Sequence, residues 1–110
     1  MKSFSFLILF ALILLAACRK SSVPVPDCIQ SKIAEFSNSS CEHGAKIEEY
    51  IFQGETVFLF SLGFCGADLG ADVVDKNCSS LGALGGFTGN TKINGEEFTN
   101  ASFVRKIWSR

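Results

Sequence analysis

Hydrophobic residues occur first in one long block and then in short periodic stretches. The block runs almost unbroken from Phe4 to Leu15, behind a positive start that contains Lys2 and ahead of two alanines. A charged start, an apolar run and small residues, in this order, are typical of a secretory signal. The run is shorter than the roughly 20 apolar residues that a membrane-spanning helix needs. We therefore expect residues 1–17 to be a signal peptide.

The first periodic stretch predicts a short amphipathic helix. Ile29, Ile33 and Phe36 are spaced four and three positions apart, so they share one face of a helix of about ten residues. Asp27, with Gln30 three positions later, has the spacing of a capping box at a helix start. A stripe this narrow needs a sheet to pack on.

Two stretches that follow predict antiparallel strands. "KIEEYIF" and "TVFLFSL" are rich in β-branched and aromatic residues and flank "QGE", where Gly54 can adopt the positive φ of a tight hairpin. The run from Val57 to Phe60 puts apolar side chains on both faces, which predicts a central strand covered on each side. Glu48 and Glu49 predict a wetter face for the first strand and solvated carboxylates.

The second half predicts further strands between glycine-rich turns. Eight of the ten glycines lie from Gly63 to Gly95. "ADVVD" and "CSSLGAL" predict short strands around a turn at "DKN", followed by a loop at "GGFTGN". Near Glu96 to Ala101 we expect a short helical turn and then an extended end, in which "FVRKIW" could form a closing edge strand; a helix capped by Asn100 is the alternative.

Together, these elements predict an α+β fold. It consists of one N-terminal helix packed on a small antiparallel sheet of about four strands, with a glycine-rich, disulfide-stapled second half. The 110-residue chain without its first 17 residues is long enough for one small domain, which we expect at 27–110. The 11 phenylalanines indicate a real apolar core.

The apolar block ends in "LAAC", which resembles the lipobox of bacterial lipoproteins. The resemblance implies that Cys18 is the first residue of the mature chain and is acylated with palmitate-type chains. Each buried CH₂ then adds about 0.8 kcal/mol to membrane affinity. The alternatives are a plain signal peptide and an uncleaved anchor.

The segment after Cys18 predicts how the domain is attached. In residues 18–26, "RKSSVPVP" combines serines with alternating prolines, which predicts a flexible, extended tether. No acidic residue follows Cys18 closely. We therefore expect a lipid-anchored protein of the bacterial cell envelope, in the outer membrane and facing the periplasm.

Four further cysteines predict a disulfide framework. Cys28, Cys41, Cys65 and Cys78 are an even set in a small exported domain, with three connectivities available. Both sequential gaps are thirteen positions, which makes the local pairs Cys28–Cys41 and Cys65–Cys78 the simplest arrangement. A zinc site that combines these thiols with His43 is disfavoured, because no two cysteines have the close C-x₂₋₄-C spacing.

A cation site is the main alternative chemistry. Asp68, Asp72 and Asp75 are spaced four and three apart and could bind calcium, although they lack the alternating oxygens and invariant glycine of a calcium loop. "GGFTGN" lacks the lysine of a nucleotide-binding loop, so its glycines are better explained by turn geometry. We expect no cofactor and no metal.

Nothing in the chain has the pattern of a catalytic site. The only histidine, His43, lies beside Cys41, but adjacent side chains rarely form a nucleophile–base pair, and we expect Cys41 to be in a disulfide. Glu48 and Glu49, as neighbours in a strand, point to opposite faces and cannot flank one glycosidic bond. The 10 basic and 11 acidic residues are scattered, so there is no basic face for nucleic acid.

The ordered set "CIQSKI", "YIFQGETVFLF", "CGADLGADVVDKNC", "LGALGGFTGN" and "NGEEF", closing on "IW", resembles a family of small secreted or lipid-anchored bacterial proteins. That family is classed as a domain of unknown function (6970-type). The likeness covers roughly Cys28 to Trp108. Many such sequences have two adjacent cysteines where this chain has Phe64 and Cys65, and a further cysteine near the end that is absent here.

These observations favour one function and one alternative. The favoured function is a non-catalytic binding or inhibitory module of the cell envelope that meets an envelope protein or glycan. The alternative is a small metal- or ligand-binding envelope protein that uses Asp68, Asp72 and Asp75.

Overall fold

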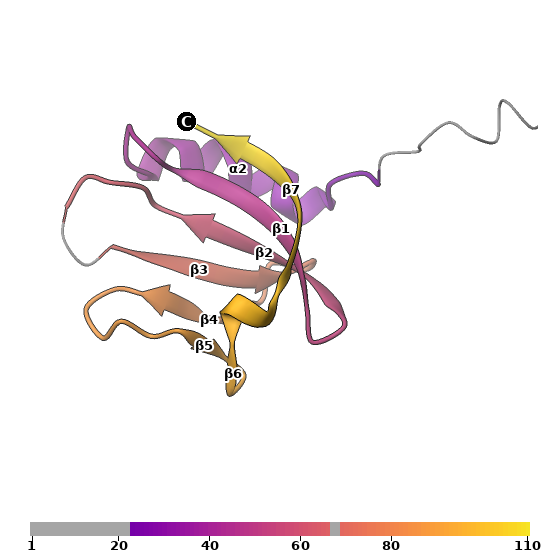
Figure 1. Cartoon of the computed structure of the whole chain (residues 1–110). Helices are drawn as coiled ribbons and strands as arrows, with labels where there is room; N and C mark the ends of the chain where they lie inside the picture. Colours follow the sequence, from indigo (N-terminus) through magenta and orange to yellow (C-terminus); the bar gives the residue numbers. More distant parts are fainter. Residues whose placement is uncertain (1–22, 67–68) are drawn as a thin grey trace, which may run out of the picture.

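A computed structural model describes residues 23–66 and 69–110 (Figure 1). The expected signal peptide, the lipidation residue Cys18 and Asp68 lie outside the described residues. The described part contains, in chain order, α2 (Asp27–Ser39), β1 (Lys46–Phe52), β2 (Glu55–Ser61), β3 (Gly70–Asp75), β4 (Ser80–Gly85), β5 (Lys92–Ile93), β6 (Glu96–Glu97), the 3₁₀ turn η1 (Phe98–Asn100) and β7 (Ser102–Ser109). None of its helices has the length and hydrophobicity required to cross a membrane.

The fold is α+β, as predicted, but the main sheet has more strands than expected. Five antiparallel strands follow the order β4-β3-β2-β1-β7, and β5 pairs with β6 in a separate two-stranded sheet. The expected number of about four was therefore wrong. The additional strand is β7, whose pairing with β1 joins residues more than 50 positions apart, as in the Glu49–Arg105 pair. The short helical turn and the extended end expected after Glu96 are confirmed as η1 and the edge strand β7, but local sequence patterns do not specify that β7 pairs with β1.

The helix precedes every described strand, but it is not the first described segment. It follows the extended residues Val23 to Pro26 and begins at Asp27. The expected capping box was wrong, because Pro26 occupies the N-cap position and no side chain caps the helix. The Gln30 side chain instead donates a hydrogen bond to the Val25 carbonyl at 3.2 Å. The proline supplies an extended backbone (φ −54°, ψ 144°) that leads directly into the first turn.

The first hairpin agrees with its prediction. Gln53 and Gly54 form the two-residue turn, both at positive φ (52° and 76°), which matches the twist of the flanking strands. The strand that follows, β2, is the central strand of the five. Phe58 and Phe60 face one side of it and Val57 faces the other, so both faces of β2 are covered, as expected.

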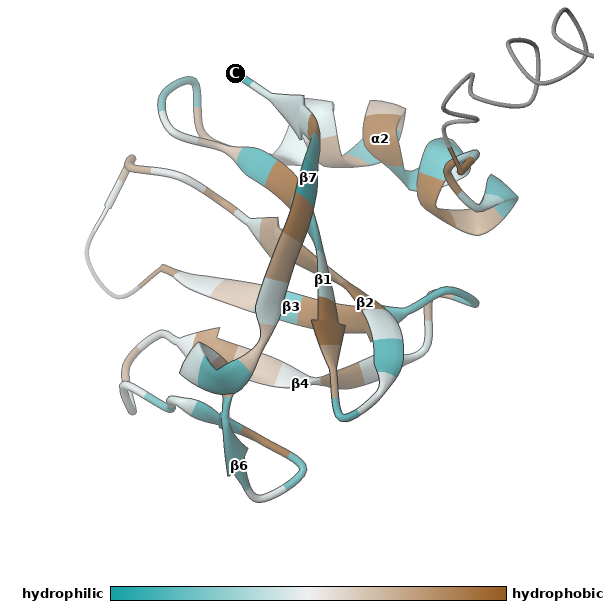
Figure 2. Ribbon diagram, turned by 45° about the vertical axis from the view of Figure 1, so that its right-hand side comes forward, coloured by the Kyte–Doolittle hydropathy of each residue, from teal (hydrophilic) through white to brown (hydrophobic). Residues whose placement is uncertain are grey.

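Two hydrophobic clusters lie on opposite faces of the sheet. The cluster on the face toward α2 is built from Ile29, Ile47, Phe58, Phe60 and Val74. The cluster on the other face is built from Phe52, Val57, Val73, Ile93 and Phe98, which brings β5 and η1 against the sheet. In Figure 2 the hydrophobic residues lie along the central strands and recur along α2. The sheet is therefore the middle layer between α2 and the β5–β6–η1 segment.

The acidic pair on β1 departs from the expected solvated face. Glu48 and Glu49 point to opposite faces, as alternation requires, but both are buried, with 7% and 8% of their surface exposed. Each has a cationic partner: Lys46 Nζ lies 3.2 Å from Glu48, and Arg105 Nε lies 3.0 Å from Glu49. The burial follows from the position of β1 between β2 and β7, which the sequence of β1 does not specify.

The disulfide pairing differs from the simplest expectation. Cys28 is bonded to Cys78, and Cys41 to Cys65, so the two local pairs were wrong. The bonds do not lie within the second half of the chain. Each joins the helical segment to a loop beside β3, because α2 lies along the sheet and brings its two ends to the two ends of β3.

These long-range disulfides predict a large contribution to stability. In the loop-entropy model, the separations of 50 and 24 residues correspond to about 4 and about 3.5 kcal/mol. We expect the C28S/C78S variant to lose slightly more unfolding free energy than the matched C41S/C65S variant, as measured by urea denaturation of the exported protein. Peptide mapping without reduction that links Cys28 to Cys41, or a loss below about 1 kcal/mol in both variants, would contradict this assignment.

Candidate functional site

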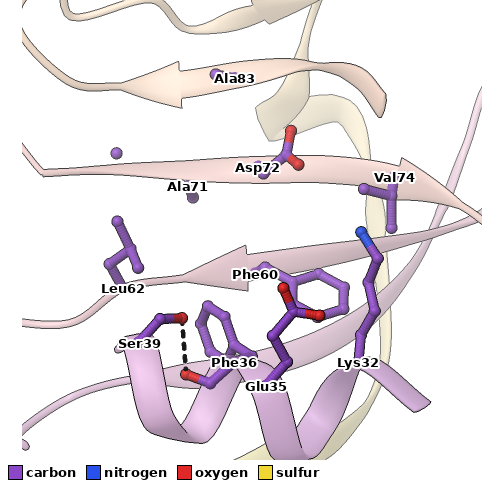
Figure 3. Close-up of a pocket in the computed structure, with 11 residues that line it drawn as sticks. Lys32, Glu35, Phe36, Ser39, Phe60, Leu62, Ala71, Asp72, Val74 and Ala83 are labelled. Carbon is purple, nitrogen blue, oxygen red and sulfur yellow. Dashed lines mark hydrogen bonds between the residues drawn. The ribbon is translucent and has the colours of Figure 1, made fainter. Parts of the chain in front are cut away.

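The helix covers only part of its face of the sheet and leaves a cleft beside β3 and β4 (Figure 3). The cleft has a volume of about 390 Å³. One wall is α2 and the other is the sheet. The lining residues are Lys32, Glu35, Phe36 and Ser39 from α2, and Phe60, Leu62, Gly70, Ala71, Asp72, Val74 and Ala83 from the sheet and its loops.

The base of the cleft is apolar and firmly packed. Phe36 and Phe60 meet edge to face, with ring centroids 5.2 Å apart and planes at 87°. Phe36 also makes an edge-to-face contact with Trp108, with ring centroids 5.7 Å apart. This contact connects the base of the cleft to β7. Such aromatic contacts add to burial and restrict ring orientation. The base therefore presents a fixed hydrophobic surface.

The cleft is open beside β3 and β4 because Gly70, Ala71 and Ala83 have small side chains or none. A Cβ at Gly70 would lie 2.7 Å from the carbonyl oxygen of Leu84, so close approach of β3 and β4 requires glycine at this position. Ala83 on β4 is exposed and carries only a methyl group toward the opening. No large side chain from β4 fills the space that α2 leaves.

Three charged side chains surround this apolar base. Lys32 and Glu35 lie one turn apart on α2 and extend toward the sheet, whereas Asp72 comes from β3 on the opposite wall (Figure 3). Asp72 accepts a hydrogen bond from the Ser80 hydroxyl at 2.9 Å. Across residues 23–66 and 69–110, ion pairs form only at Glu48 and Glu49. The charges of the cleft are therefore available to a ligand.

The two disulfides lie at the two ends of the cleft. Cys28 precedes the α2 wall and Cys78 follows β3, whereas Cys41 follows the α2 wall and Cys65 precedes β3. The helix and β3 run in opposite directions, so each bond ties the walls together at one end (Figure 1). The segments that carry Glu35 and Asp72 are therefore covalently joined at both ends of the cleft.

The two described aspartates of the proposed cation site, Asp72 and Asp75, do not share a surface. Asp72 faces the cleft, but Asp75, three positions later in the same strand, faces the other side. Asp75 Oδ1 accepts hydrogen bonds from the backbone N–H groups of Asn77 (2.8 Å) and Ser79 (2.9 Å) and so shapes the β3–β4 turn. Within the described ranges, no group of three His, Cys, Asp or Glu side chains could hold a metal ion.

The other residues considered from the sequence have structural positions. Cys41 is in a disulfide, as expected, and His43 is exposed in the loop after α2, where its carbonyl accepts the Phe64 N–H at 2.8 Å. In "GGFTGN", Gly86 and Gly89 have φ of 68° and 64°, and Gly89 N–H donates to Gly86 at 3.2 Å. The turn explanation for these glycines is confirmed.

No motif in the sequence pointed to Lys32 and Glu35 as residues of a site. Both flank the apolar stripe of Ile29, Ile33 and Phe36, and this position at the edge of a buried helical face was the available signal. This signal could not predict the whole site, because only the three-dimensional arrangement places Asp72 on the wall opposite Lys32 and Glu35.

Comparison with known families agrees with the resemblance seen in the sequence. The family model described as "Domain of unknown function (DUF6970)" matches residues 34–110, and the chain belongs to this family. No curated protein and no solved structure matches the chain. The matched range contains Glu35, Asp72 and every described strand, but it begins after Lys32.

Tyr50, on the sheet face opposite α2, has an altered acidity. Burial raises the pKa of Tyr50 above its ordinary value of 10.0, and the charge and hydrogen bond of Glu48 raise this pKa further. The Tyr50 hydroxyl donates to Glu48 Oε1 at 3.3 Å. Since the folded-state pKa lies above the unfolded one, Tyr50 contributes stability below pH 10, and this contribution is lost as the pH rises through the folded-state pKa.

Titration of the only tyrosine tests this environment directly. We expect the phenolate absorbance near 295 nm to develop with an apparent pKa above 10, as is typical of a desolvated tyrosine beside a carboxylate. E48Q should lower the pKa without restoring its ordinary value, because burial remains. The matched control E42Q, in the exposed loop after α2, should leave the pKa unchanged. A pKa at or below the ordinary value would contradict the structure.

Proposed function

We propose that this chain is a non-catalytic binding or inhibitory module of the cell envelope, and that it meets its partner through the cleft between α2 and β3–β4. The observation that carries the proposal is a preformed apolar cleft with three available charges. Its volume lies within the range of small-molecule sites, which runs from about 300 to about 1,000 Å³. The two disulfides join the α2 wall to the sheet wall at both ends of the cleft. The protein therefore loses less conformational entropy when a ligand binds.

The positions of the reactive groups favour binding over catalysis. The Cys41 thiol is used in a disulfide, and Glu48 and Glu49 lie on opposite faces, where they cannot act on one bond. Asp72 is the member of the proposed cation-binding set that lines the cleft. Its opposite neighbours Lys32 and Glu35 carry charges of both signs, which favours an organic ligand over a metal ion.

We further propose that the domain is held to the membrane by acyl chains on Cys18. "LAAC" supports this anchor, and the two disulfides fit an oxidising compartment outside the cytoplasm. Val23 and Pro24 are exposed, and they lead to the N-terminal end of α2. The absence of an acidic residue close behind Cys18 supports an outer-membrane position facing the periplasm.

Binding of simple aromatic compounds tests the cleft as a site. Benzyl alcohol, benzoate and benzylamine can be titrated separately into the ¹⁵N-labelled exported protein. We expect at least one of them to shift the backbone amide signals of Asp72 and Ala83, because its ring displaces water from the apolar base. A83W should abolish these shifts by filling the cleft.

The control is a tryptophan placed away from the cleft. F87W changes a side chain that is 90% exposed in the β4–β5 loop, so it should leave the titration unchanged. Shifts that are scattered over the surface, or that persist in A83W, would overturn the proposal that the cleft is the binding site.

Intact mass tests the anchor. Protein from the membrane fraction should have the mass of an acylated chain that starts at Cys18, and reduction should add about four hydrogens for the two disulfides. The C18S variant cannot be acylated at this position, so its intact mass should lack the added acyl chains. An unacylated mature chain would contradict the anchor, and no mass gain on reduction would contradict the disulfides.

A further inference from the structure

We infer that the cleft binds a small zwitterion: an amino acid or short peptide whose free ammonium and free carboxylate lie beside an apolar side chain. This inference rests on the proposed binding function and names its ligand. It follows from the signs and positions of the three cleft charges and from the apolar base between them.

The two carboxylates select an ammonium group. Glu35 extends from α2 toward the sheet and Asp72 lies on β3, so two of the three charged side chains that line the cleft are carboxylates (Figure 3). An ammonium has three N–H donors and no acceptor, so either carboxylate can accept a hydrogen bond from it. Asp72 is already oriented by the Ser80 hydroxyl, which leaves its second oxygen for the ligand.

Lys32 adds a requirement that a simple amine does not meet. Its side chain extends from α2 toward the sheet one turn before Glu35. A ligand with only a positive charge would place like charges together, and a ligand with only a negative charge would face two carboxylates. A molecule that carries both an ammonium and a carboxylate complements all three side chains.

The apolar base determines the rest of the ligand. Phe36, Phe60 and Val74 form a hydrophobic surface below the charges, and Ala83 leaves space above β4. A volume of about 390 Å³ is at the small end of the range for ligand sites, so it suits one or two amino-acid residues rather than a long polymer. The neighbouring rings also favour a nearby cation through cation–π attraction.

Compounds that differ only in their charged groups test the inference. Phenylalanine keeps both charges, phenylalanine amide keeps only the ammonium, and N-acetylphenylalanine keeps only the carboxylate. We expect phenylalanine to bind tightest, about threefold tighter than the amide and about tenfold tighter than the N-acetyl compound, since exposed ion pairs contribute up to about 1 kcal/mol each. The readout is the dissociation constant from amide shifts of Asp72 and Ala83 in the ¹⁵N-labelled exported protein.

Three substitutions assign the charges to the cleft side chains. E35Q and D72N should each reduce the preference for phenylalanine over N-acetylphenylalanine, and K32M should remove the preference for phenylalanine over its amide. The controls E42Q and K76M change exposed charges outside the cleft and should alter no preference. Each preference is a ratio of two dissociation constants measured on the same variant. A small loss of stability affects both constants equally and leaves the ratio unchanged.

The outcomes separate the ligand from the function. Equal or tighter binding of N-acetylphenylalanine, or of uncharged benzyl alcohol, at the cleft would overturn the zwitterion while leaving a binding module in place. Absence of cleft shifts with every compound would overturn both. A parallel titration with phenylalanyl-alanine distinguishes the two sources: tighter binding of this dipeptide assigns the site to a short peptide, and tighter binding of phenylalanine assigns it to a free amino acid.

Discussion

Two covalent bonds between segments that are distant in the sequence hold α2 in place on the sheet once its apolar stripe has packed there. Cys28–Cys78 holds the start of the helix to the β3–β4 turn, and Cys41–Cys65 holds the segment after the helix to the loop before β3. A helix of 13 residues is marginal on its own, so its stability comes from its contacts with the sheet. The same bonds define the two ends of the cleft.

The sheet supplies a rigid wall for that cleft. β2 lies at its centre, and both of its faces are covered, by α2 on one side and by β5 and η1 on the other. Phe36 connects this core to the site, because it packs against Phe60 and Trp108 and also lines the cleft. The surface of the cleft is thus continuous with the hydrophobic core, and Lys32, Glu35 and Asp72 come from α2 and β3, whose flanking segments the two disulfides join.

Several features could be predicted because they depend on neighbouring residues. The unbroken apolar run in β2 predicted a strand covered on both faces, the turn chemistry predicted positive φ at Gly54, and the stripe from Ile29 to Phe36 predicted the helix. The burial of Glu48 and Glu49 was not predicted, since it depends on β7 as the outer neighbour of β1. A strand pattern indicates which residues alternate, but not which strands lie beside it.

The sequence by itself determined the fold class, the central strand, the family and the presence of a disulfide framework. Only the tertiary structure decided the cysteine pairing and the site, because both depend on the direction in which α2 crosses the sheet. That direction places Cys28 beside Cys78, and it places Glu35 opposite Asp72 across the cleft. Spacing along the chain favoured local bonds, whereas packing of the apolar stripe against Phe58 and Phe60 set the distances at which sulfur atoms and charges meet.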